Sequence, residues 1–155
     1  MKTKKISYDD LSSMGQGYAD AILDTNGFWP YEDTKEIRKW ESRDASSFSS
    51  DACESIALAC DTALVFLATE LGGIDRMVDS LGGQWDDLGE TLWHWRQGSG
   101  HEPDFGSDNL DRAVMTAFGK LGEAFVEIGR GRIHHFDNTK KKCLDASAVA
   151  AVHGS

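Results

Sequence analysis

The chain has 155 residues, which is typical of a single domain and is long enough to bury a hydrophobic core without disulfides or metals. Its hydrophobic fraction of 40% and charged fraction of 27% are those of an ordinary soluble protein. The formal net charge of −10 argues against direct binding to nucleic acid or to an anionic membrane.

The N-terminal part predicts a helix followed by an aromatic loop. Residues 1–20 lack the apolar stretch of a signal peptide, and Ser7 with Asp10 fits the start of a helix that we expect to reach Gly27. In the next segment Trp29 and Tyr31 flank a proline, which excludes a central strand. This loop either folds onto the core or is exposed for recognition. In the second case Trp29 and Tyr31 are candidate partner-binding residues.

The middle of the chain predicts two consecutive helices. Apolar side chains recur every three or four positions over residues 51–71, which is typical of a helix with one buried face. Cys53 and Cys60 belong to that face, so we interpret them as small core residues that stay reduced in a cytosolic compartment. A shorter helix is expected over residues 74–81, and a pair of glycines ends each of the two. The longest apolar run, near residues 63–68, is too short to span a bilayer.

The last third of the chain predicts a strand, a helix and a hairpin. Residues 91–96 are predicted to form a strand, in which Trp93 and Trp95 point to one side and Leu92 and His94 to the other. A helix over residues 108–121 and a hairpin of residues 124–128 and 132–136 follow. We therefore predict an α+β fold, a single mainly helical domain over residues 1–136, with a small three-stranded sheet confined to residues 91–136. Residues 137–155 are expected to form a tail that is basic at first and then alanine-rich.

Acidic residues are concentrated in the middle of the chain. Between Asp44 and Asp111 fourteen acidic residues stand against two basic ones, a net charge of −12, whereas the chain from Arg112 onward has four acidic and seven basic residues, a net charge of +3. Such a region favours contact with a basic surface, although it also fits a solvated face that maintains solubility. The candidate partner-binding carboxylates lie on or near the two middle helices: Asp51, Glu54, Asp61, Asp75, Asp79, Asp86 and Asp87.

A second candidate site combines aromatic and basic residues beside a glycine-containing loop. An arginine next to such a loop can hold an anion, because glycine lets backbone N–H groups approach closely. The alternative is that the tryptophans pack in the core and Arg96 pairs with an acid. The candidate anion-binding residues are Trp93, Arg96, Gly98, Gly100 and His101. The histidines and cysteines lack the spacing of a metal site, and no nucleophile motif is present, so we expect no metal, cofactor or catalytic residue.

The same part of the chain resembles a loose group of small phage-encoded proteins. In that group a W-x-x-R-x-G-x-G loop precedes an amphipathic helix and a short hairpin that starts after Gly-Glu. The resemblance covers about the last third of the chain and rests on Trp93, Arg96, Gly98, Gly100, Phe105, Gly122, Glu123 and Gly129. Leu121 stands where the group usually has phenylalanine, and the glycine loop is longer and more acidic here. The resemblance implies a phage or mobile-element accessory protein in bacterial cytoplasm, without an activity to carry over.

Three functional hypotheses follow. The first is a non-catalytic acidic inhibitor of a bacterial defence complex, of the anti-CRISPR or anti-restriction type, whose carboxylates take the place of phosphates. Its partner would be a nuclease or CRISPR effector subunit with a basic surface. The second is a small hydrolase or nucleotide-binding enzyme that uses Trp93, Arg96 and His101. The third is a structural or regulatory accessory protein that forms a homodimer through the aromatic loop.

Overall fold

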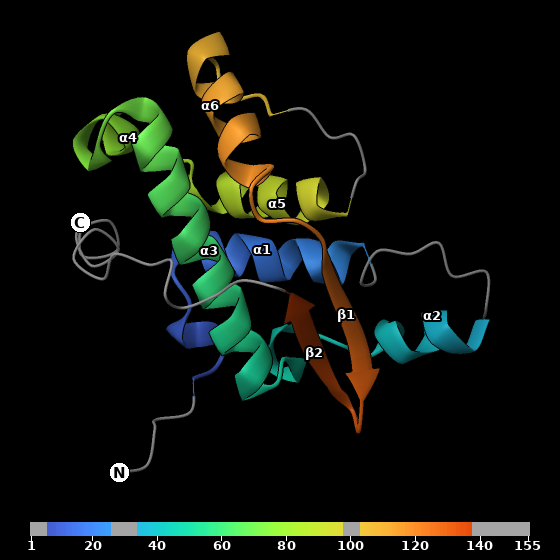
Figure 1. The fold of residues 1–155 in the computed structure, drawn as a ribbon. Coiled ribbons are helices and arrows are strands. Elements are labelled where there is room, and N and C mark those ends of the chain that lie inside the picture. The colour runs from blue at the N-terminus through green and yellow to red at the C-terminus, as the bar shows by residue number, and fades with distance from the viewer. Residues whose placement is uncertain (1–5, 26–33, 98–102, 138–155) are drawn as a thin grey trace.

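The protein has an α+β fold that is mainly helical, with one small antiparallel hairpin (Figure 1). The structure, a computed structural model, describes residues 6–25, 34–97 and 103–137. Two 3₁₀ helices, η1 and η2, cover Tyr8–Asp10 and Ala45–Ser47. The helices and strands in the described ranges are α1 (Ser13–Asp24), α2 (Thr34–Glu41), α3 (Ser50–Leu71), α4 (Ile74–Leu81), α5 (Trp85–Arg96), α6 (Asp108–Phe118), β1 (Ala124–Gly129) and β2 (Arg132–Asp137).

Helix α3 crosses the molecule in front of α1 (Figure 1). The predicted apolar stripe lies on its buried face. Cys53 and Cys60 are fully buried in that stripe, as the spacing predicted, and both are free thiols. Ser49 begins the helix by accepting a hydrogen bond from the Ala52 N–H, and Gly72 ends it with a left-handed backbone. Among the described helices, α3 alone is long and apolar enough to cross a membrane, but 56% of that apolar window is buried inside the protein. Packing in the core therefore accounts for its hydropathy.

Helices α1 and α5 pack against each other at two glycines. A methyl group at Gly17 would overlap the Asp86 carbonyl, and one at Gly89 would overlap the Met14 carbonyl. The backbones can therefore approach this closely only because neither position has a Cβ. This contact explains why α1 and α5 contain Gly17 and Gly89, although glycine weakens an isolated helix.

The hairpin is formed by β1 and β2 in register, with Phe125 opposite Phe136 and Val126 opposite His135. Its two-residue turn has positive φ at Arg130 and Gly131, as in the tight turns that suit hairpins. One face packs against the helices, whereas Phe125 and Phe136 on the other face are 61% and 51% exposed. The predicted hairpin is thus confirmed, with each strand one residue longer at its C-terminal end.

The predicted three-stranded sheet is wrong, because residues 91–96 belong to helix α5. Trp93 is fully buried and Trp95 is only partly buried, so these tryptophans do not share the face that a strand would give them. The helical spacing begins upstream of the predicted strand, where Leu88 and Leu92 are buried four positions apart. The six residues of the predicted strand, taken alone, are too short a segment to reveal the helical period of about 3.6 residues.

Two helix boundaries also differ from the prediction. The segment after Ser7 forms only the short helix η1, and α1 starts at Ser13, where the Ser12 side chain accepts from the Gly15 N–H. The capping contacts between Ser7 and Asp10 do exist, but they close one 3₁₀ turn. The last helix ends at Phe118 and continues as a turn up to Leu121, whose side chain is still buried.

Candidate functional site

Helices α1, α3 and α5 meet strand β2 in a buried polar cluster. The Tyr18 hydroxyl lies 2.7 Å from His135 Nε2, and Ser55 Oγ lies 2.7 Å from His135 Nδ1. Arg96 donates to Asp137 over 2.7 Å and to the Tyr18 hydroxyl over 3.4 Å. The cluster therefore joins four elements of the fold through side-chain hydrogen bonds.

Arg96 also fixes the chain that leads into β1. It donates from Nε to the Gly122 carbonyl over 3.0 Å and from Nη2 to the Glu123 carbonyl over 3.3 Å. Only 2% of Arg96 is exposed, and the ion pair with Asp137 balances its charge in the interior. Arg96, Gly122 and Glu123 are among the residues on which the resemblance to small phage-encoded proteins rests. In this chain the three residues lie together because the Arg96 side chain holds the backbone that leads into β1.

The direction of the hydrogen bonds follows from Arg96, because a guanidinium group can only donate. Tyr18 accepts from Arg96, so its own proton is available to His135 Nε2. In the tautomer that this arrangement favours, His135 carries its proton on Nδ1 and donates it to Ser55 Oγ. The chain of hydrogen bonds thus runs from the buried cation to the Ser55 hydroxyl.

Burial determines the protonation states in this cluster. Desolvation lowers the pKa of His135 to about 4; Asp137 opposes the shift, whereas Arg96 favours it. Desolvation also raises the pKa of the Tyr18 hydroxyl well above its usual value. At neutral pH both side chains are uncharged, and the only charges in the cluster are those of Arg96 and Asp137.

This arrangement does not activate Ser55 as a nucleophile. A general base must accept the serine proton, whereas in the tautomer favoured by Arg96 the His135 Nδ1–H donates to Ser55 Oγ. The low pKa of His135 also disfavours the imidazolium ion that would form after proton transfer. The opposite direction would give Tyr18 a second donor, because His135 Nε2–H and Arg96 would both point at its oxygen.

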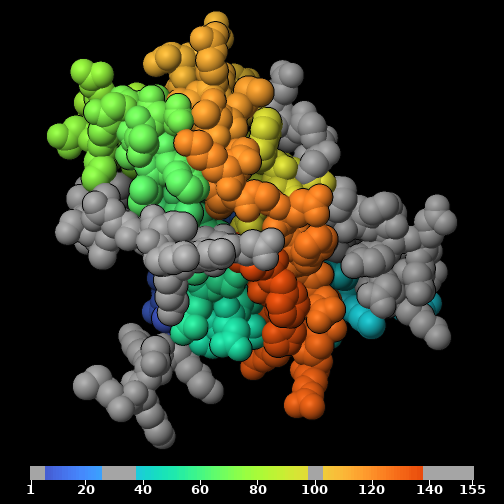
Figure 2. All heavy atoms as spheres, in the orientation of Figure 1, coloured from blue at the N-terminus to red at the C-terminus, as the bar shows by residue number. Residues whose placement is uncertain are grey.

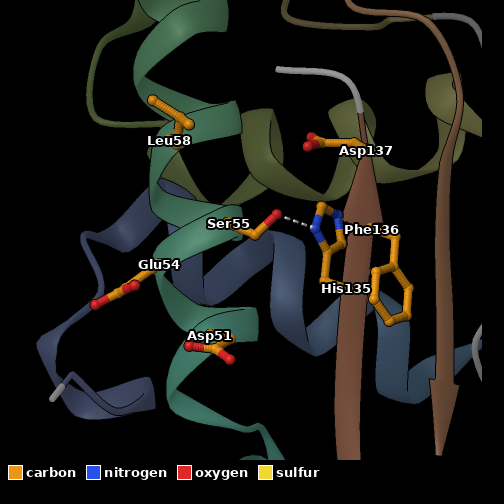
Figure 3. Close-up of a pocket in the computed structure, with 7 residues that line it drawn as sticks. All are labelled: Asp51, Glu54, Ser55, Leu58, His135, Phe136 and Asp137. Atoms are coloured by element: carbon orange, nitrogen blue, oxygen red, sulfur yellow. Dashed lines mark hydrogen bonds between the residues drawn. The ribbon is translucent and has the colours of Figure 1, made fainter. Parts of the chain in front are cut away.

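A pocket of about 410 Å³ opens over the Ser55 end of the cluster, between α3 and β2 (Figure 3). Ser55 points from α3 toward His135, and Asp137 lies at the end of β2 facing the helix. The lining residues differ in chemistry and come from the N-terminal half of α3 and the end of β2: Asp51, Glu54, Ser55, Leu58, His135, Phe136 and Asp137.

The structure distributes the predicted partner-binding acids over two separate surfaces. Asp51 and Glu54 are exposed near the start of α3 and line the pocket. The second set lies on α4, which follows the C-terminal end of α3, and in the first turn of α5, which packs against α1 at Gly17: Asp75, Asp79, Asp86 and Asp87. Asp61 is partly buried near the middle of α3 and belongs to neither set.

Trp93 and Arg96, two of the residues predicted to bind an anion, make hydrogen bonds inside the protein. Trp93 is buried and donates from Nε1 to the Thr25 hydroxyl over 3.0 Å, and the Arg96 guanidinium is occupied by Asp137 and two carbonyls. A small hollow of about 190 Å³ does lie beside Arg96. Within the described ranges, no group of three or more His, Cys, Asp or Glu side chains is arranged to hold a metal. Other predicted site residues lie outside the described residues: Trp29, Tyr31, Gly98, Gly100 and His101.

The sequence analysis did not identify Tyr18, Ser55, His135 or Asp137 as site residues. One signal was present, because strand alternation places His135 on the same face as the buried Ile133. An inward-facing histidine on a strand requires polar partners. The partners themselves were hidden, since Tyr18 and His135 are separated by 117 positions.

Comparisons of the chain with protein-family models, curated proteins and solved structures give no match. The resemblance to small phage-encoded proteins therefore stays a prediction from the sequence. The function has to be argued from the geometry and charge of the described residues.

Proposed function

We propose that the protein is a non-catalytic acidic binding protein, an accessory of a phage or mobile element that blocks a bacterial defence complex. It would occupy a basic surface of a restriction nuclease or CRISPR effector subunit, with its carboxylates in the place of nucleic-acid phosphates. The proposal places its action in the cytoplasm of the bacterial host.

The observation that carries this proposal is the set of exposed acids without internal partners. These acids are Asp51, Glu54, Asp75, Asp79, Asp86 and Asp87. None of them forms an ion pair or a side-chain hydrogen bond within the part of the chain that the structure describes. The buried charges, by contrast, are paired. Exposed unpaired carboxylates favour association with a basic partner and raise the association rate.

The enzyme hypothesis has less support from the geometry. Trp93 and Arg96, two of its three residues, are committed to internal hydrogen bonds, and the lowered pKa of His135 makes it a weak base for Ser55. A homodimeric accessory protein has one specific observation in its favour, because Phe125 and Phe136 form an exposed cross-strand pair. Light scattering on the purified protein, with Phe125→Ser as the variant, separates a dimer through this face from a monomer.

The decisive test is inhibition in living cells and with purified components. The protein is expressed in bacteria that carry an active restriction or CRISPR system, and the plating efficiency of a targeted phage is measured. We expect plating to rise at least tenfold over an empty vector for a system that the protein blocks. With the purified nuclease, inhibition should saturate at one inhibitor per target and weaken as salt rises. Complete inhibition at far lower ratios would instead indicate an enzyme.

A further inference from the structure

We propose that the pocket between α3 and β2 receives one arginine side chain of the partner protein. This inference rests on the proposed function, because it names the chemical group that the acidic binding protein would recognise. It also makes the pocket with Asp51 and Glu54 the specific contact. The acids of α4 and of the first turn of α5 would then only attract a basic partner through their charge.

The charge of the lining favours a cation. Asp51 and Glu54 lie on the α3 side of the pocket, and no described basic residue pairs with either carboxylate. The floor does not repel a cation, because buried His135 is neutral above about pH 4 and the Arg96 charge is balanced by Asp137. A positively charged group would thus meet carboxylates at the rim and uncharged polar groups beneath.

The shape and polarity of the walls favour arginine over a bare ion. Leu58 supplies apolar surface, on which the methylene stem of a long side chain can pack. A guanidinium group pairs with a carboxylate through two parallel N–H···O bonds, so Asp51 and Glu54 suit arginine better than a compact ammonium group. Ser55 Oγ, held by His135, adds a hydrogen-bond acceptor of fixed position. The volume of about 410 Å³ exceeds what a metal ion needs and lies within the range of ligand pockets.

The first experiment measures binding of a defined probe by amide chemical shifts. The probe is the capped tripeptide Gly-Arg-Gly, and the control probe carries citrulline, which has the shape of arginine without its charge. We expect the arginine peptide to shift the amides of Ser55, His135 and Phe136, and the citrulline peptide to bind at least fivefold more weakly. Equal binding of the two peptides would overturn the assignment.

Charge-matched variants separate the pocket from general attraction. Asp51→Asn with Glu54→Gln removes two charges at the pocket, and Asp86→Asn with Asp87→Asn removes two charges at the other acidic surface. We expect the first variant to weaken peptide binding at least fivefold and the second by less than twofold. Equal weakening in both would show that net charge, not the pocket, attracts the peptide, and no binding to the wild type would also overturn the proposal.

Another occupant is possible, because Lys140–Lys142 follow Asp137 closely in the sequence. If the peptide binds only after these lysines are replaced by glutamine, the pocket belongs to the chain's own tail and the partner assignment is wrong. Failure of this inference is distinguishable from failure of the proposed function. Defence blocking that persists in the pocket variant leaves the function standing, whereas a wild-type protein that blocks no defence system removes it.

Discussion

The charged residues in the interior and those on the surface follow opposite rules. In the interior, Arg96 has a partner for Nε and for both terminal nitrogens, and its ion pair with Asp137 ties α5 to β2. On the surface, the acids of α4 and of the first turn of α5 have no described partner. Figure 2 shows how far the surface of α4 lies from the hairpin. A buried charge must be compensated or the fold fails, whereas an exposed one is compensated by water and remains available to a partner.

The largest expected loss of stability comes from removing the partner of a buried charge. Arg96→Ala leaves the Asp137 carboxylate and two carbonyls without their donor, which should cost about 3–5 kcal/mol of unfolding free energy in urea melts. Arg112→Ala, at an exposed position of α6, is the matched control and should change it by less than about 0.5 kcal/mol. A loss below about 1 kcal/mol for Arg96→Ala would mean that the buried cluster does not hold β2 in place.

A comparison of two glycines tests the helix contact beside the cluster. Gly89→Ala would place a methyl group against the Met14 carbonyl, so α1 and α5 must move apart, at a cost of about 3 kcal/mol. Gly15→Ala is the control, because its methyl would meet only the Leu11 side chain, at 3.1 Å from Cβ. The gain in helix propensity should offset that contact and leave stability nearly unchanged. Equal losses in thermal or urea unfolding would contradict the close approach at Gly89.

The sequence predicted those parts of the fold that depend on local periodicity. Helices α3 and α4 were recognised from residues three or four apart and from the glycines that end them, and the hairpin from its turn. The residues 91–96 were misread because the Gly89 contact and the buried face of α5 depend on α1, far away in the chain. The buried cluster was missed for the same reason, since its members lie on four elements that meet only in the folded protein.

The next effect is a pH dependence that belongs to one buried histidine. Folding lowers the pKa of His135 from an ordinary 6.5 to about 4, so the unfolded chain binds more protons between these values. Its contribution to stability is full above about pH 6.5 and is lost as pH falls toward 4, by up to about 1.4 kcal/mol per pH unit. Urea melts at pH 7.0 and 5.0 measure this loss for the wild type.

Two variants assign the pH effect to its residue. His134→Gln changes the neighbouring histidine on the opposite face of β2 and should keep the full loss of stability between pH 7.0 and 5.0. His135→Gln should reduce that loss, because the group that takes up the proton on unfolding is gone. If both variants behave like the wild type, another group is responsible and His135 is not held neutral by its surroundings.

The smallest expected effect on stability comes from the exposed acids, which should matter far less to folding than the buried ion pair. Asp86→Asn with Asp87→Asn removes two charges from the first turn of α5, where they interact favourably with the helix dipole but repel their acidic neighbours. Because these terms oppose each other and both are exposed, unfolding free energy should change by less than about 0.5 kcal/mol. The repulsion is screened by salt, so raising sodium chloride from 20 to 500 mM should stabilise the wild type more than the variant. A loss above about 1.5 kcal/mol at low salt would show that these carboxylates hold the fold together, and the surface would then obey the same rule as the interior.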